Sequence, residues 1–279
     1  MTPDQLTERL GRVRDAGYAA PTDHWHLTES MLQPGHIGHP DPQLRDDLIY
    51  GTLARWITAG VYSDDQLRHI LTVAVDEQHL FYGFGSRDDD SVLTRAFSAL
   101  LIPPVLAVHK QHSVLEPREV QALIAPLQRY LEGERDFRGY DTELGWLHAI
   151  AHAADALGSL MQAPDIDGGG VLRLLESLRT AAANQHHVYA HGEDERLAKA
   201  MTAGLRRPEL SRAERADWLA GFRPLVHACG DMGMPEGYAR LVNVNHTLRA
   251  LYFLVRNEEP VGAALATGID ELLLDFSKL

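Results

Sequence analysis

Two histidines and an aspartate, His148, His152 and Asp155, stand in the otherwise apolar, alanine-rich stretch GWLHAIAHAADALGSL (145–160). If this stretch is a helix, each residue turns by about 100°, so His152 lies at about +40° and Asp155 at about −20° from His148. All three side chains then share one narrow stripe. Neutral imidazole and carboxylate are good ligands for zinc, iron or manganese, and this spacing can present them to one divalent ion.

Two interpretations of this stripe stay open. In the first, Asp155 accepts a hydrogen bond from His152, His148 bonds a backbone carbonyl, and the stripe is a structural or binding network. In the second, the stripe holds a metal ion, with Glu193 or Asp194 from the next predicted helix as further ligands. The first is favoured, because one helix supplies only two or three ligands and no known zinc-enzyme motif is present. Acids at a helix start are also explained by the helix dipole.

The surroundings of the stripe indicate where it faces. No Lys, Arg, Glu or Gln occurs in 145–160, although a strip facing bulk water would commonly carry such residues. The rest of the predicted helix is apolar or small, which is typical of a helix buried on most sides. We therefore expect the stripe to line a groove or cavity, and the helix over 143–161 to be the most buried of the long helices.

Other predicted helices also carry polar residues among apolar ones, and together they predict a polar groove. Two of these residues, Arg95 and Arg249, bring positive charge into an acidic protein and suit a carboxylate or phosphate group on a ligand. Aromatic residues beside the stripe can stack on a ligand, although core packing is their commoner role. The predicted groove residues are Arg95, Tyr140, Trp146, His148, His152, Asp155, Asn245, His246 and Arg249.

The composition of the chain limits which classes of binding partner and which cellular compartment are expected. The chain of 279 residues has 26 Lys and Arg against 39 Asp and Glu, a net charge of −13. This balance works against nucleic-acid and anionic-membrane partners. No apolar run reaches the length of a transmembrane helix, and the start lacks a signal-peptide core. The single Cys229 excludes an intrachain disulfide and a multi-cysteine zinc site, so we expect a cytoplasmic protein with an inert buried thiol.

The elements that must position the stripe are helical almost throughout, and no convincing strand pattern is found. Capping boxes predict helix starts after Thr2, Ser63 and Ser211, each with Gln or Glu three residues later. Pro103-Pro104 predicts that a helix ends or kinks at this point.

Ordered by these signals, the chain shows five weak repeats of about 40 to 50 residues, each an antiparallel helical hairpin. Hairpins of this kind bury their apolar faces by stacking, which predicts an all-α solenoid. We expect capping helices in 1–32 and a single repeat domain in 33–279. The first helices of the hairpins are predicted at 41–57, 90–106, 141–161, 192–206 and 237–256, and the second helices at 63–75, 116–131, 168–182, 211–226 and 260–276.

Several phrases resemble an uncharacterised bacterial family, domain of unknown function 2785, from about residue 36 to residue 255. The phrases are DPQLRDDLIYGTLARWI, DDSVLTRAFSALL, FRGY (137–140), GWLHAIAHAADAL and HGEDERLAKA. HPDPQLRDDLIYGTLARWI and HAADALGSL are also similar to HEAT-type helical repeats. The resemblance implies a HEAT-like α-solenoid and carries no assigned activity.

Two functions follow as hypotheses. One is a binding or scaffold protein whose concave polar groove takes a peptide partner or a small anionic ligand, without nucleic acid or membrane. The other is a metal-dependent enzyme, hydrolytic or oxidative, with a divalent ion on the helix face of His148, His152 and Asp155. Convergence of further ligands on that helix would separate the two.

Overall fold

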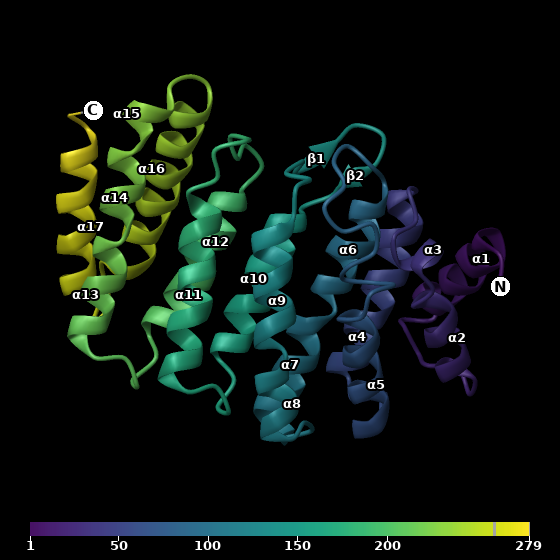
Figure 1. The fold of residues 1–279 in the computed structure, drawn as a ribbon. Coiled ribbons are helices and arrows are strands. Elements are labelled where there is room, and N and C mark those ends of the chain that lie inside the picture. The colour runs from purple at the N-terminus through teal and green to yellow at the C-terminus, as the bar shows by residue number, and fades with distance from the viewer. Residues whose placement is uncertain (259–260, 279) are drawn as a thin grey trace. The chain divides into compact units, whose positions relative to one another are not determined.

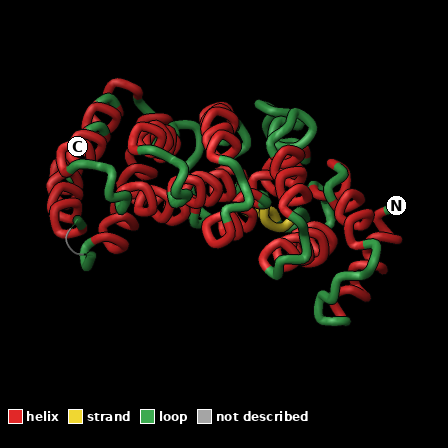
Figure 2. The backbone as a smooth tube through the Cα atoms, turned by 90° about the horizontal axis from the view of Figure 1, so that it is seen from below, coloured by secondary structure: helices red, strands yellow, loops and turns green. Residues whose placement is uncertain are grey.

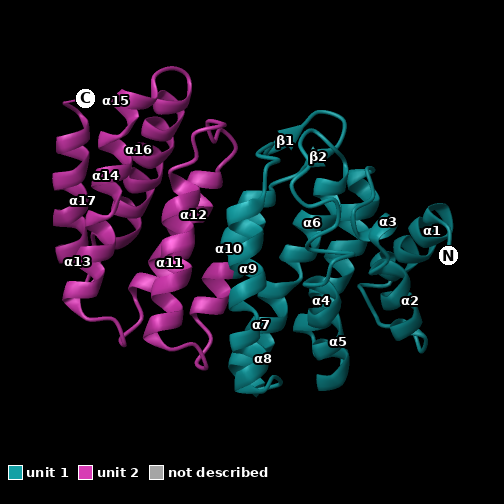
Figure 3. Ribbon diagram, in the orientation of Figure 1, with its two compact units in different colours: residues 1–156 teal, residues 157–279 magenta. Residues whose placement is uncertain are grey.

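The protein is described by a computed structural model that covers residues 1–258 and 261–278. Helices make up nearly all of its regular structure (Figure 1), and Figure 2 shows the short strands in yellow among helices in red. The all-α prediction is confirmed at this level. The chain divides into two compact units, Met1–Ala156 and Leu157–Leu279 (Figure 3). The division falls within one helix, and the predicted single repeat domain over 33–279 stays a prediction.

Unit 1 begins with two helices in the region where capping helices are expected, and the buried Leu6, Leu10 and Val13 face inward from the first of them. The helices of this unit are α1 (Pro3–Asp15), α2 (His24–Met31), α3 (Pro34–Ile37), η1 (Gln43–Tyr50), α4 (Gly51–Thr58), α5 (Asp64–Ala74), α6 (Ser91–Leu100), α7 (Ile102–His112), α8 (Pro117–Ala122) and α9 (Ile124–Gly133), followed by the strands β1 (Tyr140–Asp141) and β2 (Gly145–Trp146) and the start of α10 (Ala149–Met161).

Unit 2 contains the end of α10, then α11 (Gly168–Ala182), α12 (Glu193–Leu205), α13 (Arg212–Ala220), α14 (Phe222–His227), α15 (Cys229–Met232), α16 (Glu236–Val255) and α17 (Gly262–Phe276). Helices of successive predicted hairpins contact one another in this unit. The predicted first helices α12 and α16 lie against each other, as do the predicted second helices α11 with α13 and α13 with α17. Within a hairpin, α16 packs on α17. Unlike helices also contact across hairpins, since α11 lies against α12.

The local signals in the sequence mark helix starts correctly. Thr2, Ser63 and Ser211 each accept a hydrogen bond from the backbone three residues later, and the partner side chain returns the bond. The double proline also acts as expected, because α6 ends at Leu100 and α7 begins at Ile102. Proline lacks a backbone donor, which costs nothing in the first turn of a new helix.

The predicted helix over 41–57 is not a uniform α-helix. Its first half, η1, is an eight-residue π-helix, and α4 continues from it. A π-helical stretch is rare and widens the helix, so side chains emerge at angles that an α-helix does not offer; such stretches often accompany functional sites. Periodicity cannot reveal this change, because both helix types present one apolar face.

The prediction of a helix over 141–161 is wrong at its start. The helix α10 begins at Ala149, and residues 140–146 form a hairpin in which Tyr140 pairs with Trp146. The side chain of Asp141 accepts hydrogen bonds from the amides of Glu143 and Leu144 at 2.8 and 2.9 Å, which favours a turn. Gly145 has a φ of +73°, a conformation that suits glycine and breaks a helix.

The expected burial of α10 is clear, since all its residues except Asp155 and Ser159 are buried. In α6, residues 92–99 are all buried as well.

By length and composition, one described stretch, Ser91–His112, resembles a membrane span, but 67% of its most apolar window is buried inside the protein. This burial is what a core helix shows, and the resemblance is weak evidence for a membrane.

Candidate functional site

The β1–β2 hairpin of unit 1 presents two aromatic side chains to solvent. Tyr140 is 46% exposed and Trp146 is 44% exposed. Their rings meet edge to face, with centroids 4.8 Å apart and planes at 69°. Large aromatic side chains bury most of their surface in an ordinary core, so an ordered exposed pair is a surface suited to a ligand or partner.

A half-buried histidine supports this pair from below. The Trp146 ring stacks on His148, with centroids 4.4 Å apart and planes at 27°. His148 has a φ of +49°, in the left-handed region that non-glycine residues seldom adopt, and its amide donates to the Gly139 carbonyl at 3.3 Å. It therefore precedes α10 instead of lying on it. The helical-wheel argument for a shared stripe fails for His148, because the turn at Gly145 shifts the helix start.

His152 lies on α10 and is buried. Its Nδ1–H donates to the carbonyl of Ala96 at 3.2 Å, and its ring meets those of Phe97 and His148 edge to face, at 5.3 and 5.7 Å between centroids. A carbonyl only accepts, so Nδ1 carries a proton in this hydrogen bond. The aromatic series thus runs from the exposed Tyr140 through Trp146 and the two histidines into the core.

A buried arginine fixes the hairpin in place. The Arg45 side chain, on η1, is fully buried. Its Nη1 donates to the carbonyls of His39 and Pro40 at 2.8 and 3.2 Å, and its Nη2 donates to those of Leu144 and Trp146 at 2.7 and 3.3 Å. One guanidinium therefore ties the loop before η1 to the hairpin. A planar fork of fixed donors suits this task, and a single ammonium does not.

The counter-charge of this arginine is its neighbour in the chain. The Nε atom of Arg45 lies 2.7 Å from Oδ1 of Asp46, and neither atom has another hydrogen-bond partner in the described part of the chain. Burial raises the pKa of Asp46 to about 6, although the arginine opposes this shift. Burial likewise lowers the pKa of Arg45. The Arg45–Asp46 ion pair lies beneath the hairpin. The guanidinium carbon of Arg45 also lies 4.7 Å from the centre of the Phe97 ring.

Glycine is required where the hairpin meets this arginine. A Cβ atom on Gly145 would lie 3.0 Å from Cβ of Pro42 and 3.5 Å from Nη2 of Arg45, and the backbone already has a positive φ. Both the space and the conformation therefore exclude larger residues. The hairpin is held against η1 by contacts that leave its aromatic side chains outside.

Arg95 takes a different role from the one expected. Its side chain is fully buried, and its Nε and Nη2 donate to the two carboxylate oxygens of Glu134 at 2.8 and 3.0 Å. Its Nη1 donates to the carbonyls of Tyr82 and Gly83 and to Ser91 Oγ. The arginine is thus used inside unit 1 and offers no free donor to an anionic ligand, which corrects its assignment to a groove.

The remaining predicted site residues lie apart from the hairpin in the chain. Asn245, His246 and Arg249 are on α16 of unit 2, where Asn245 donates to its own helix at the Leu241 carbonyl and the other two are exposed. In the same unit, Cys229 is buried and burial raises the pKa of its thiol, in agreement with an inert cysteine.

The metal hypothesis gains no support from the geometry. Among residues 1–258 and 261–278, no group of three or more His, Cys, Asp or Glu side chains is arranged to hold a metal ion. His148, His152 and the half-buried Asp155 do not form such a group. Glu193 and Asp194 belong to unit 2, at the start of α12, and their convergence on the histidines stays a prediction.

Sequence reasoning missed Arg45 and Asp46. A signal was present, because Arg45 stands one helical turn before Ile49, which is buried, and an arginine on a buried face must be paired or bonded. The partners themselves were not predictable, since the Leu144 and Trp146 carbonyls lie about a hundred residues later in the chain.

Comparison with known proteins adds a family and nothing on activity. A family model described as "Protein of unknown function (DUF2785)" matches residues 80–253, more than half of the chain. The match includes the hairpin and the histidines. No curated protein and no solved structure matches the chain.

Proposed function

We propose that this chain, which belongs to the DUF2785 family of proteins of unknown function, is a binding protein that captures a cationic side chain of a peptide partner on its Tyr140–Trp146 pair. One observation carries the proposal. Two large aromatic side chains, each more than two-fifths exposed, are held in a defined mutual orientation. Trp, Tyr and Arg dominate the side chains that contribute most to protein interfaces.

Several features that hold the Tyr140–Trp146 pair in place lower the stability of the fold, which supports a role in binding. A fully buried guanidinium (Arg45), a half-buried carboxyl group (Asp46) and a histidine with a positive φ (His148) all contact or precede a hairpin of seven residues. Each of these features costs free energy when considered alone. A rigid hairpin lowers the entropy lost on binding, so the pair is pre-organised for a ligand.

Charge favours a cation over an anion at this place. Asp141 and Glu143 stand on the hairpin, and Asp41 and Asp47 are exposed on the segment against which it packs. Backbone hydrogen bonds lower the pKa of Asp141, so this carboxylate stays ionised. The face of an indole ring attracts cations, and nearby carboxylates strengthen this attraction. Arg45 does not oppose it, because Asp46 pairs with it below the surface.

The helical pairs of unit 2 support a HEAT-like stack as the scaffold of this protein. The supporting observation is the like-with-like packing of the predicted first and second helices in unit 2. In such repeats the helices form a rigid body, and exposed segments between them supply the contacts to partners. The hairpin is a segment of this kind, placed between α9 and α10.

The proposal is tested by calorimetric titration of the full chain with a hexapeptide that contains three arginines. We expect binding that weakens as salt is raised, because surface charge contributes to it. Trp146→Ala and Tyr140→Ala should each weaken binding by about tenfold, the equivalent of roughly 1.4 kcal/mol.

The matched control is Phe253→Ala, which removes an aromatic side chain that is 63% exposed on α16. It should leave the affinity unchanged. The same peptide with glutamates in place of arginines should not bind. Equal binding of both peptides, or equal losses in all three alanine variants, would show that the pair is not a site for a cation.

A further inference from the structure

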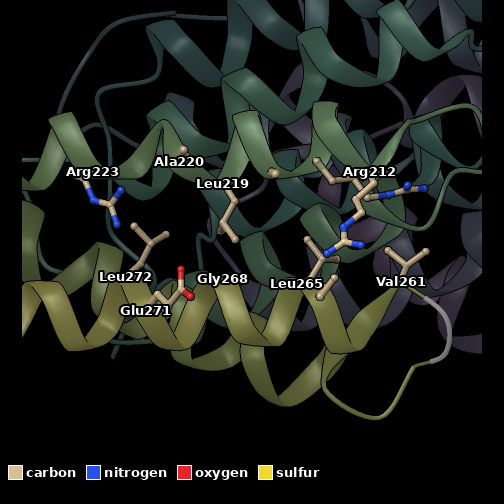
Figure 4. Close-up of a pocket in the computed structure, with 12 residues that line it drawn as sticks. Arg212, Leu219, Ala220, Arg223, Val261, Leu265, Gly268, Glu271 and Leu272 are labelled. Carbon is tan, nitrogen blue, oxygen red and sulfur yellow. The ribbon is translucent and has the colours of Figure 1, made fainter.

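Unit 2 contains a cavity of about 330 Å³ between α13 and α17 (Figure 4). Its size is at the lower end of the range for small-molecule sites. The floor is apolar and includes Leu219, Leu265 and Leu272, all of which are buried. Gly268 lies between them, and a Cβ atom there would be 2.8 Å from Leu219 Cδ2. The glycine therefore allows α17 to approach α13 closely along this floor.

Three arginines line the same cavity, in a protein whose net charge is −13. Figure 4 shows Arg212 at the end of the cavity near Leu265, and Arg223 at the opposite end near Leu272 and Glu271. The two ends differ in their charge balance. Arg223 pairs with Asp275 at 3.1 Å, and Glu271 adds a further negative charge beside it.

Among the described residues, Arg212 has no such partner. It is exposed, and no ion pair or hydrogen bond of its side chain is found within residues 1–258 and 261–278. Arg215, which also lines the cavity, is buried and anchored by its Nε and Nη2, each of which donates to a backbone carbonyl of the 205–207 segment at 2.7 Å. Carbonyls do not cancel a full positive charge, although the Glu214 carboxylate also interacts with Arg215. Arg212 thus keeps a charge beside the apolar floor that no described residue pairs.

We propose that this cavity binds a small amphipathic anion, a hydrocarbon chain that ends in one carboxylate. The carboxylate of the ligand lies against Arg212 and near the positive charge of Arg215. Its hydrocarbon chain lies over Leu219 and Leu265 towards Leu272. Glu271 repels a second anionic group at the far end and so selects a ligand charged at one end only. This site is separate from the hairpin of unit 1 and does not depend on the function proposed for it.

The test is a calorimetric titration of the full chain with decanoate, decanol and decyltrimethylammonium. We expect decanoate to bind at least tenfold more tightly than the neutral and cationic compounds. Arg212→Gln should reduce the affinity for decanoate about tenfold. Ala264→Trp, which places a bulky ring at an exposed position of the cavity wall, should abolish binding of all three compounds.

The matched control is Arg256→Gln, since Arg256 is an exposed arginine at the end of α16 that does not line the cavity. It should bind decanoate like the parent. Circular dichroism checks that each variant is folded, and the Arg212 variant changes only an exposed side chain. Equal binding of decanoate and decanol, or undiminished binding by the Ala264→Trp variant, would overturn the proposal. So would the absence of decanoate binding by the parent.

Discussion

Replacing Arg45 tests whether one guanidinium holds the aromatic hairpin in place. In Arg45→Lys the charge remains, but the fork that reaches two segments is lost. The structure gives four carbonyl contacts, two to residues 39–40 and two to Leu144 and Trp146. A lysine ammonium cannot serve both segments from one nitrogen atom, so at least two of these hydrogen bonds are lost.

The magnitude follows from the kind of bond that is lost. A hydrogen bond that involves a charged group contributes roughly 1.5–3 kcal/mol, so two lost bonds amount to about 3 kcal/mol or more. Arg45→Met removes all the contacts and leaves the half-buried Asp46 without a counter-charge. Breaking a buried pair in this way costs about 3–5 kcal/mol. The lysine variant should therefore lie between the parent and the methionine variant in its free energy of unfolding.

Two assays measure this effect together. Urea unfolding gives the change in stability, and hydrogen exchange followed by mass spectrometry reports on the hairpin itself. The amides of Leu147 and His148, which both donate to the Gly139 carbonyl, should exchange faster in both variants. Arg55→Lys is the control, because Arg55 is an exposed arginine ten residues further on, and it should change stability by less than about 0.5 kcal/mol. Unchanged stability and unchanged exchange in Arg45→Lys would refute the reasoning.

Three further outcomes are expected. Burial raises the pKa of Asp46 from 3.8 to about 6. The folded state therefore binds this proton more tightly than the unfolded state, which stabilises the fold by at most about 3 kcal/mol. This stabilisation is complete below about pH 4 and is lost as the pH rises through about 6. Asp46→Asn should remove that part of the pH dependence of the melting temperature. Ala153→Leu overpacks a fully buried position of α10 and should cost about 1–3 kcal/mol in urea unfolding. Glu134→Gln leaves Arg95 buried without its counter-charge and should cost about 3–5 kcal/mol, measured in the same way.

Most helix positions could be predicted because their signals are local. Capping boxes at Thr2, Ser63 and Ser211 and the double proline after Ile102 act within a few residues of themselves. The helix start near 141 was misplaced for a local reason as well. A turn built by Asp141 and Gly145 outweighed an apolar pattern that reads as helix. Such a short hairpin carries too few residues for a strand pattern to be visible.

The candidate site could be predicted only in part. Tyr140, Trp146 and the two histidines were expected to line a groove. Their rings form a contacting series, and the groove itself stays a prediction. Whether a polar residue on an apolar face lines a groove or pairs within the core depends on residues far away in the chain. Arg95 pairs within the core because Glu134 accepts its hydrogen bonds, and Arg45 does so because the hairpin carbonyls accept its hydrogen bonds. No spacing within one helix carries that information.

The most direct test of the proposed binding surface is a nuclear magnetic resonance titration of tryptophan side chains. The chain has four tryptophans, and the indole Nε1–H signal of each is a separate probe. Trp146→Phe identifies the signal of the hairpin, while Trp56 is a buried reference whose Nε1–H donates to the Tyr18 carbonyl at 2.8 Å. When the arginine-containing hexapeptide is added, the Trp146 signal should shift and saturate while the Trp56 signal stays in place. A Trp146 signal that does not move at saturating peptide would contradict the proposal that the hairpin is the binding surface.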